Sequence, residues 1–313
     1  MRYDVVVIGE PLIEFVADEP LSAATAFTLG FAGDALNAAV AAAAAGARTA
    51  LLTRLGSDEL SDRLVAYLSV HGVSTDLVLR ESGQSGAYVL GADPDGTRAF
   101  AYLRAGSAAT RLTPADVDAA GLGDTRAVLF SGITAALSES CLLAVRRAAR
   151  VVRESGGHVV YDPNFRARLT TAEAASAAFT QLAPDLTVAL PSAPSDTAAL
   201  FGCTSAVEAA RAVHERGTPI AVVTQGHRGV AVSERGHLTE LPVVPAPHIV
   251  DATGAGDSFA GTLTARLALG DDLLGAVRLG TAAASLALGG RGGTGHVASL
   301  AESRAHLSGH ATV

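Results

Sequence analysis

The stretch DATGAGDSFAG, residues 251–261, decides how the rest of the chain is interpreted. After it, Phe259, Leu263 and Leu267 recur at every fourth position, which predicts a helix that begins near Gly254 and ends near Gly270. Small residues at a helix N-terminus leave backbone N–H groups open to an anion, and the helix dipole adds to the attraction.

Asp257 lies in the first turn of this predicted helix. A glycine-rich turn followed by an aspartate is also the ordinary start of a capped helix, so a bare Gly-x-Gly-Asp favours the plainer interpretation. The full string is more specific. We interpret Gly254, Ala255 and Gly256 as an anion hole for a phosphoryl group, and Asp257 as the base that takes a proton from an attacking hydroxyl.

The composition excludes several other chemistries. The chain has 313 residues, 49% of them hydrophobic and 17% charged, which is enough for a large core. All 23 residues in the Lys and Arg count are arginine. The lack of lysine excludes a Walker A P-loop, a protein-kinase site and a Schiff-base aldolase. A net charge of −8 argues against nucleic-acid or anionic-membrane partners.

The cysteines and the N-terminus point to the cytoplasm. Cys141 and Cys203 form no metal-type pair, and a disulfide framework is not expected from two such residues. The opening MRYDVVVIGEP lacks the pattern of a signal peptide, and the longest apolar stretch, residues 38–45, is too short to span a bilayer. We therefore expect a cytoplasmic protein.

Short apolar runs alternate with helix-like segments along most of the chain. The predicted strands are residues 3–8, 127–130, 158–161, 186–190 and 220–223, and the predicted helices are residues 36–45, 58–71, 139–154, 172–182 and 205–215. Such runs are typical of strands buried on both faces, and the alternation predicts an α/β fold with a parallel sheet covered by helices on both sides.

Two stretches break this alternation. Residues 12–16 predict a short strand directly after the first one, and residues 86–105 predict a hairpin with strands at 87–90 and 98–103 and a turn at 93–96. A small sheet built from them would cover the carboxyl edge of the main sheet, where open α/β sheets bind ligands. We interpret this small sheet as a lid.

The chain resembles the ribokinase-like, or PfkB, carbohydrate kinases. DATGAGDSFAGTL (251–263) resembles their second signature, and GFAGDALNAA (30–39) with RLGSD (54–58) resembles the first. The resemblance runs from about residue 4 to about residue 288. It implies one kinase domain over residues 1–313, a Rossmann-like sheet between helices, and a β-sheet lid from about residues 11–32 and 86–108. ATP with Mg²⁺ would supply the phosphoryl group, and some relatives also use a monovalent cation near Asp251.

Within the family, the chain is most similar to the 2-keto-3-deoxygluconate kinases. The stretches that carry this similarity are GEPL (9–12), RAGSAA (104–109), SGIT (131–134) and DPNFR (162–166). The resemblance implies phosphorylation of the sugar to its 6-phosphate. The substrate residues would be Gly33, Asn37, Tyr88, Tyr102, Arg104, Ile133, Arg166 and Asp257. Two arginine forks suit a carboxylate or the transferred phosphate, although the tyrosines could also be a cross-strand aromatic pair.

Other functions on the same scaffold stay open at this stage. A fructokinase or another PfkB-type sugar kinase would share all of the catalytic residues. A nucleoside or vitamin kinase is disfavoured by the two lid tyrosines and Arg104. A non-catalytic sugar-binding regulatory protein is opposed by Asp257 and the anion hole, since a pure binder has little need of a positioned base. The family resemblance also implies a homodimer that forms through the lid.

The nucleotide and metal residues match the family less well. The resemblance implies ATP contacts from Ser192, Thr224, Gly226, Gly229, Gly254, Gly256 and Thr281. Many members have an Asn-x-x-Glu pair whose Glu helps to place Mg²⁺, but here Ser192 and Ser195 stand at those positions. No metal ligand is assigned on this basis, and Asn164 and Asp196 are the candidates that remain.

Two C-terminal patterns are interpreted as structurally unremarkable. GRGGTG (290–295) matches Gly-x-Gly-x-x-Gly, but it follows a helix-like stretch and fewer than 20 residues remain after it, so no dinucleotide-binding unit can form there. His306 and His310 have zinc-type spacing without an adjacent Glu. We expect a flexible loop at residues 290–295 and a tail that frays toward Val313.

Overall fold

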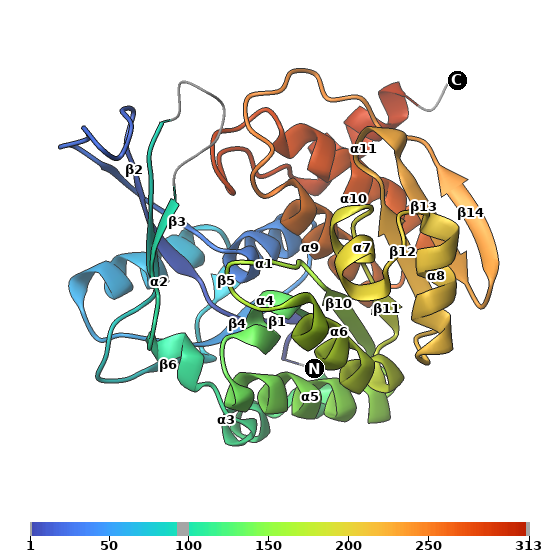
Figure 1. The fold of residues 1–313 in the computed structure, drawn as a ribbon, viewed down its shortest axis with the longest axis horizontal. Coiled ribbons are helices and arrows are strands. Elements are labelled where there is room, and N and C mark those ends of the chain that lie inside the picture. Colours follow the sequence, from blue (N-terminus) through green and yellow to red (C-terminus); the bar gives the residue numbers. More distant parts are fainter. Residues whose placement is uncertain (1, 93–99, 311–313) are drawn as a thin grey trace.

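The computed structural model describes residues 2–92 and 100–310, and most of its strands form one large sheet (Figure 1). These strands are β1 (Val5–Ile8), β4 (Thr49–Leu55), β5 (Val73–Ser74), β6 (Val78–Arg80), β9 (Ala127–Ser131), β10 (His158–Asp162), β11 (Val188–Ala189), β12 (Ile220–Thr224), β13 (Val230–Glu234) and β14 (His237–Leu241). The order is β14-β13-β12-β11-β10-β9-β1-β4-β5, with β6 paired to β4. Pairing is parallel from β12 to β5 and antiparallel between β12, β13 and β14.

Helices cover both faces of this sheet, as the alternation of strands and helices predicts. They are α1 (Asp34–Ala44), α2 (Glu59–Val70), α3 (Pro114–Ala120), α4 (Gly132–Ala136), α5 (Glu139–Glu154), α6 (Ala172–Leu182), α7 (Ser195–Phe201), α8 (Ala206–Glu215), α9 (Ala255–Ala268), α10 (Leu273–Ala287) and α11 (Leu300–Gly309). Because side chains alternate along a strand, Val5 and Val7 pack with α1, α9 and α10, while Val6 and Ile8 pack with α5 and α6.

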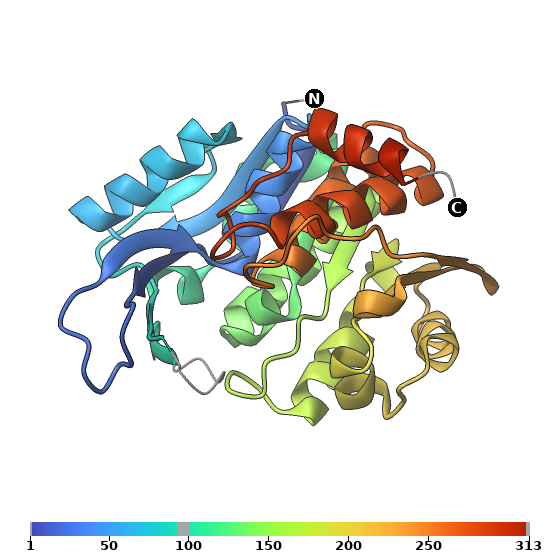
Figure 2. The ribbon, with the colours of Figure 1, turned by 90° about the horizontal axis from the view of Figure 1, so that it is seen from above.

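A second, four-stranded sheet lies beside the carboxyl ends of the central strands. It contains β2 (Leu12–Val16), β3 (Thr28–Ala32), β7 (Ala87–Leu90) and β8 (Phe100–Leu103), in the order β3-β2-β7-β8. Its inner face carries Leu12, Tyr88 and Leu90, which form a small apolar cluster with Ala32. Figure 2 shows this sheet standing away from the main layers, with the connection between α10 and α11 next to it.

The predicted α/β fold is confirmed, and the strands and helices that were predicted differ by a few residues in their limits. Strands β3, β4, β5, β6, β13 and β14 were not placed from the sequence, and the last two add an antiparallel edge to the expected parallel sheet. The hairpin formed by β7 and β8 is present, while its expected turn at residues 93–96 lies outside the described residues. The prediction for the tail is wrong in part. Residues after Gly289 include α11, which begins with a capping box in which Ser299 and Glu302 bond to each other's backbone N–H.

Over residues 2–92 and 100–310, we find no helix with the length and apolar character that crossing a membrane requires.

Candidate active site

The N-terminus of α9 points to the centre of the site because α9 packs unusually close to α1. Gly261 lies against the backbone of Ala38, and a Cβ atom at this glycine would come within 3.0 Å of the Ala38 carbonyl carbon. Gly254, the residue before the helix, has φ 80°, a conformation that a side chain disfavours. The glycines of the 251–261 stretch thus serve both the close helix contact and the turn that opens the backbone N–H groups.

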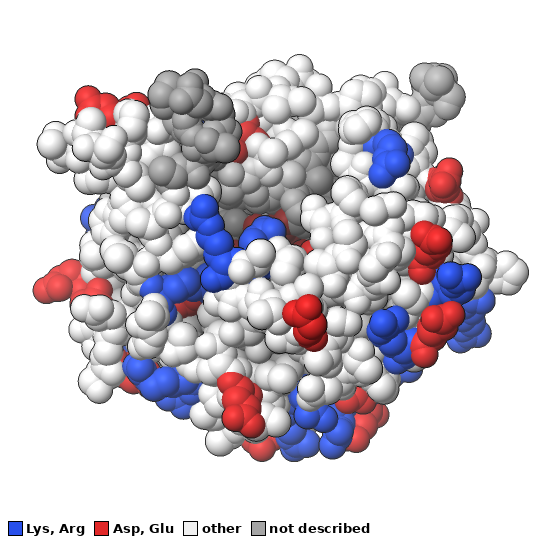
Figure 3. All heavy atoms as spheres, viewed as in Figure 1, with Lys and Arg blue, Asp and Glu red and all other residues white. Residues whose placement is uncertain are grey.

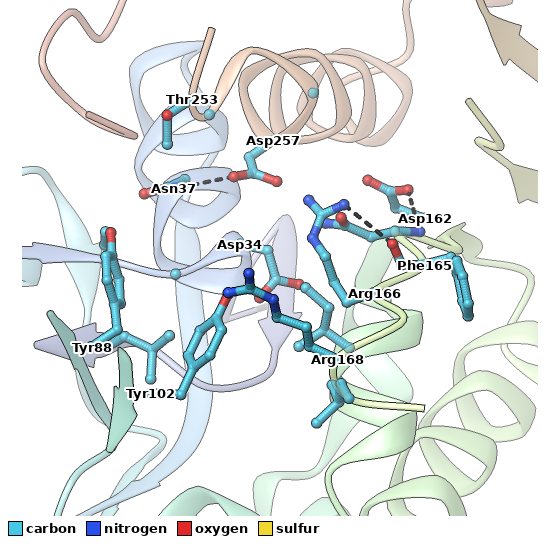
Figure 4. A pocket seen from close by; sticks show the side chains of 18 of the residues that line it. Asp34, Asn37, Tyr88, Tyr102, Asp162, Phe165, Arg166, Arg168, Thr253 and Asp257 are labelled. Carbon is cyan, nitrogen blue, oxygen red and sulfur yellow. Dashed lines mark hydrogen bonds between the residues drawn. The ribbon is translucent and has the colours of Figure 1, made fainter. Parts of the chain in front are cut away.

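The close contact brings Asn37 of α1 to Asp257 of α9. The Asn37 Nδ2 atom donates a hydrogen bond of 2.8 Å to Asp257 Oδ2. Asn37 is buried, so its amide has few other conformations. Figure 4 shows the two side chains facing each other above the pocket. The family signature at residues 30–39 and the one at residues 251–263 therefore meet in a single hydrogen bond.

The surroundings of Asp257 raise its pKa to about 7. The main cause is desolvation by burial, and the negative charge of Asp34 acts in the same direction. The hydrogen bond from Asn37 and the charge of Arg166 lower the pKa and partly offset this rise. A carboxyl group that gains and loses its proton near neutral pH is suited to general-base catalysis.

Two further carboxylates lie near Asp257. Asp34, the first residue of α1, accepts a hydrogen bond from Ser131 at the end of β9. Asp162, at the end of β10, accepts one from the Asn164 backbone N–H at 3.0 Å. Burial raises the pKa of both groups, and for Asp162 the charges of Asp196 and Asp257 add to that rise. The pocket therefore carries a concentration of negative charge that cationic ligands or arginines can stabilise.

The pocket in front of these groups has a volume of about 990 Å³. It opens to the surface as the hollow at the centre of Figure 3, where basic side chains stand at its rim. All of the expected substrate residues line this pocket: Gly33, Asn37, Tyr88, Tyr102, Arg104, Ile133, Arg166 and Asp257. The lid and the main sheet contribute opposite walls.

Two lid side chains are held by buried glutamates. Arg104 forms an ion pair with Glu10, which also accepts a hydrogen bond from Ser107. The Tyr88 hydroxyl donates to Glu14 on the neighbouring strand β2. Tyr88 and Tyr102 are also a cross-strand pair, with ring centroids 6.3 Å apart. The tyrosines thus combine the two roles considered from the sequence, because they pack on each other and also face the cavity.

Arg166 and Arg168 reach the pocket from the other wall, on the segment after β10 (Figure 4). Within the described part of the chain, neither forms an ion pair with a carboxylate. This segment is fixed by Asp196, whose Oδ1 accepts the Phe165 N–H at 2.8 Å. Two exposed guanidinium groups beside a cavity are a suitable receptor for a carboxylate or a phosphate.

The expected nucleotide residues lie at different distances from the pocket. Ser192, Thr224, Gly254 and Gly256 line it. Gly226 and Gly229 form the tight turn after β12, both with positive φ. Thr281 lies within α10, buried, and its hydroxyl bonds to the Val277 carbonyl. The structure therefore brings most of this set to one edge of the main sheet and leaves Thr281 in the helix behind it.

The oxygen donors of the pocket fit Mg²⁺, which prefers carboxylate, carbonyl and water oxygens. Both oxygens of Asp196 are already used, since Oδ2 accepts from the Ser192 N–H at 2.8 Å and from its hydroxyl at 2.7 Å. Asn164 and the buried Asp162 line the pocket and remain as oxygen donors. The burial that raises the pKa of Asp162 is a cost that a bound divalent cation would relieve.

Several pocket residues were not picked out from the sequence. They are Asp34, Asp162, Phe100, Arg168 and Thr253. Asp34 and Asp162 stand inside stretches that the family resemblance covers, so their positions carried a signal: a carboxylate at the carboxyl end of a strand or at the start of the following helix. The pairing of Glu14 with Tyr88 carried none, because it joins residues 74 positions apart.

The arrangement can bind a polyhydroxy substrate and deprotonate one of its hydroxyls. Asp257 is placed to act as a base, the N-terminus of α9 would add positive potential beside it, and the arginines could neutralise anionic groups. The lid covers the substrate side and Thr224 marks the side toward β12. This is the set of parts that phosphoryl transfer requires: positioning, a proton acceptor and stabilisation of negative charge.

Comparison with known proteins agrees with this geometry. The family model described as pfkB family carbohydrate kinase matches residues 2–298. The 2-dehydro-3-deoxygluconokinase of Thermoproteus tenax is 34% identical over 92% of this chain and 89% of its own. The 2-dehydro-3-deoxygalactonokinase of Haloferax volcanii is 31% identical over 91% of both chains.

A solved structure of a sugar kinase is similar to this chain over nearly its whole length. The crystal structure of 2-dehydro-3-deoxygluconokinase from Thermotoga maritima has a TM-score of 0.84 and 27% sequence identity, and it covers 97% of this chain and 99% of its own. Similarity therefore extends over both the large sheet and the lid.

Proposed function

The chain belongs to the pfkB family of carbohydrate kinases and is a sugar kinase, and from this premise we propose that it transfers the γ-phosphoryl group of ATP to 2-keto-3-deoxygluconate, also called 2-dehydro-3-deoxygluconate. The product would be the 6-phosphate. The observation that carries the proposal is the juxtaposition of Asp257, the N-terminus of α9 and two arginines, Arg166 and Arg168, which form no ion pair within the described residues.

Asp257 would act as the general base. The Asn37 amide orients its carboxylate, and a pKa of about 7 lets it accept a proton from the attacking 6-hydroxyl at neutral pH. The backbone N–H groups of Gly254, Ala255 and Gly256 would hold the transferring phosphoryl group. Mg²⁺, held by Asn164 and Asp162, would neutralise phosphate oxygens when bound.

The keto-acid substrate is favoured over fructose by charge. The pocket contains Arg104, Arg166 and Arg168. Arg104 is already paired with Glu10, so a substrate carboxylate would supply a counter-charge to Arg166 and Arg168, whereas a neutral hexose would not. The two relatives named above act, by their names, on dehydro-deoxy sugar acids of different stereochemistry, so we propose the gluconate form first and the galactonate form second.

A coupled ATPase assay with a sugar panel tests the proposal. The panel contains 2-keto-3-deoxygluconate, 2-keto-3-deoxygalactonate, fructose, ribose, adenosine and pyridoxal. We expect kcat/KM to be highest for a keto-deoxy acid. Highest turnover of fructose would keep the mechanism and reject the substrate. Binding of sugar without turnover at any Mg²⁺ concentration would instead support the non-catalytic alternative.

Two further features are proposed with this function. A homodimer through the lid is supported by the exposed apolar side chains of Phe27, Phe100 and Leu103 on or beside it, and sedimentation velocity would test it. A monovalent cation near Asp251 is supported by the buried carboxylate there. Replacement of K⁺ by Na⁺ or by a large organic cation at constant ionic strength should then change kcat.

A further inference from the structure

The connection between α10 and α11, residues 289–295, passes directly behind the catalytic groups. It contains the glycine pattern that has no dinucleotide-binding function here. Instead of being free, this connection is attached to three different parts of the molecule. Arg291 pairs with Asp18 at 2.8 Å, the Gly292 N–H donates to Asp251 Oδ2 at 3.0 Å, and the Thr294 hydroxyl bonds to Tyr67 at 2.6 Å.

Gly293, in the middle of this connection, is enclosed between two parts of the active site. On one side, a Cβ atom at Gly254 would lie 2.7 Å from the Gly293 Cα atom. On another, a Cβ atom at Gly293 would lie 2.6 Å from both Cγ and Oδ1 of Asn37, and closer still to Nδ2. The Gly293 backbone therefore contacts the turn of the anion hole and the amide that holds Asp257.

The conformation of Gly293 does not itself require a glycine. Its φ is not among the positive values found at Gly254 and Gly292, so its backbone accepts an L side chain. The three atoms nearest to such a Cβ atom all belong to Asn37, so the collision with Asn37 is the closest that a larger residue would meet. This distinguishes Gly293 from the glycines whose positive φ fits a turn.

Asn37 cannot move away without losing Asp257. When it is ionised, as a general base must be, the Asp257 carboxylate can only accept, so Nδ2 must then be the donor. The Asn37 Oδ1 atom is buried and has no hydrogen-bond partner within the described residues. The orientation of this amide is thus set by one hydrogen bond and by packing against Gly293, and a displaced amide would leave the carboxylate of Asp257 without its donor.

We propose that Gly293 is a positioning residue for the catalytic base, because its backbone holds the Asn37 amide on Asp257. The proposal rests on the proposed function, in which Asp257 is the base. It assigns a role to the C-terminal connection that the fold alone does not require: residues 291–294 tie the lid, through Asp18, and α2, through Tyr67, to the hydrogen bond that orients the base.

The test is a double-mutant cycle of Gly293→Ala and Asn37→Ala, with Gly309→Ala as the matched control. Gly309 lies in α11, where an added Cβ atom meets nothing within 4 Å. In the wild-type background we expect Gly293→Ala to lower kcat by roughly 10- to 100-fold, since small misplacements of a catalytic group have effects of this size. In the Asn37→Ala background the colliding side chain is gone, so the same substitution should change kcat by less than about twofold.

The pH profile distinguishes positioning from a general loss of structure. Four groups face Asp257. Asp34 raises the pKa of Asp257, whereas Asn37 and Arg166 lower it. The fourth group, Asp162, has its own pKa raised by the charge of Asp257. If Gly293→Ala breaks the Asn37 hydrogen bond, the acid limb of kcat against pH moves to higher pH. The control should leave the limb in place. An unchanged limb with unchanged kcat, or an equal loss in both backgrounds, would overturn the proposal.

Two measurements keep this result separate from the fate of the proposed function. Asp257→Asn is assayed in the same series. Wild-type turnover by that variant would refute Asp257 as the base, but it would not decide whether Gly293 packs against Asn37. Thermal unfolding answers that question without activity, because Gly293→Ala should lower Tm only where Asn37 is present. If Gly293→Ala does not fold, the double variant must fold and behave as Asn37→Ala does, and an unfolded double variant would also overturn the proposal.

Discussion

Two glycine-rich segments lie against each other in this enzyme, and they differ in what their sequences reveal. Residues 251–257 lead into α9, and their glycines precede a helix that carries an aspartate in its first turn. Residues 289–295 follow α10 and precede no helix for several positions. The glycines of the first segment can be explained from the segment itself, since the helix that follows and the proposed anion hole are both local. The second segment is explained by residues that contact it from elsewhere in the chain: Asp18 after β2, Asn37 of α1 and Tyr67 of α2.

The comparison shows that the role of a glycine can be inferred from sequence when the constraint that requires a glycine is local. Gly254 has φ 80°, which a turn into a helix explains. Gly293 has no such conformation. What excludes a larger residue there is the Asn37 side chain, which belongs to another part of the chain. Variants in and around both segments should therefore separate local chemistry from long-range packing.

The largest effect is expected at Asp257. Asp257→Asn removes the proton acceptor and should lower kcat by about 10² to 10⁴-fold, with KM for sugar and ATP within a few-fold of wild type. The matched control is Asp272→Asn, since Asp272 caps α10 through the Gly275 N–H at 2.8 Å and asparagine caps equally well. Equal, small effects on kcat at both positions would refute the assignment of Asp257 as the base.

The next effect is expected at Gly254. Gly254→Ala places a Cβ atom 2.7 Å from Gly293 Cα at a positive φ, so it should destabilise the fold by about 1–3 kcal/mol. It should also distort the anion hole and lower kcat by about 10²-fold. Chemical denaturation and steady-state kinetics measure the two effects. Gly256→Ala is the control for folding, because its Cβ atom meets nothing within 4 Å; if Gly254→Ala were equally stable, contact between the segments would be refuted.

A third prediction concerns pH. Because the pKa of Asp257 is raised to about 7, kcat/KM should fall as the pH drops below that value and the base becomes protonated. The charge of Asp34 contributes to the rise, so Asp34→Asn should move this limb to lower pH. Asp118→Asn, in an exposed ion pair with Arg147, serves as control and should leave the limb unchanged. A limb that stays in place or moves upward in Asp34→Asn would contradict the assignment.

A smaller effect is expected where α2 holds the second segment. Tyr67→Phe removes the hydrogen bond of 2.6 Å to Thr294 while keeping the ring contact with Phe31, whose centroid is 5.3 Å away. We expect a loss of about 1 kcal/mol in the free energy of unfolding. Tyr3→Phe, which removes a part-buried hydroxyl that bonds to Asp76 and not to the second segment, is a suitable comparison. A stability equal to wild type would mean that Thr294 contributes no anchoring.

The smallest effect is expected at the lid end of the same segment. Asp18 and Arg291 are 82% and 63% exposed, so the ion pair between them is largely screened by water. Asp18→Asn should change the free energy of unfolding by less than about 0.5 kcal/mol. A larger loss, measured by urea denaturation at low and high salt, would show that the lid depends on this pair more than its exposure suggests.

The sequence predicted most of the fold because its signals are periodic. Buried strands such as β1 and amphipathic helices such as α5 are visible as runs and repeats of apolar residues. Five helices, α3, α4, α7, α10 and α11, were not among those predicted. Of these, α11 has a weak apolar pattern and lies among the polar residues of the tail, although its Ser299–Glu302 capping box was a local signal. Strand order within the sheet has no such local signature.

The candidate site divides in the same way. That Gly254, Gly256 and Asp257 lie together in the pocket could be predicted because one continuous stretch contains them, and the family resemblance added Asn37, the lid tyrosines and the arginines. Their roles in catalysis stay predictions. The ion pair of Arg104 with Glu10 and the hydrogen bond of Tyr88 to Glu14 could not be predicted. They depend on how the lid strands pair and on which buried carboxylate each side chain meets.

By itself, the sequence determined the α/β class and membership of a kinase family, and it predicted a base and an anion hole in the 251–261 stretch, because each of these depends on residue types at short, regular spacing. Only the tertiary structure decided the raised pKa of Asp257, which arginines form no ion pair within the described residues, and the contact of Gly293 with Asn37. These depend on burial and on distances between atoms far apart in the chain. Desolvation and steric exclusion act over a few ångströms in space, whatever the separation along the sequence.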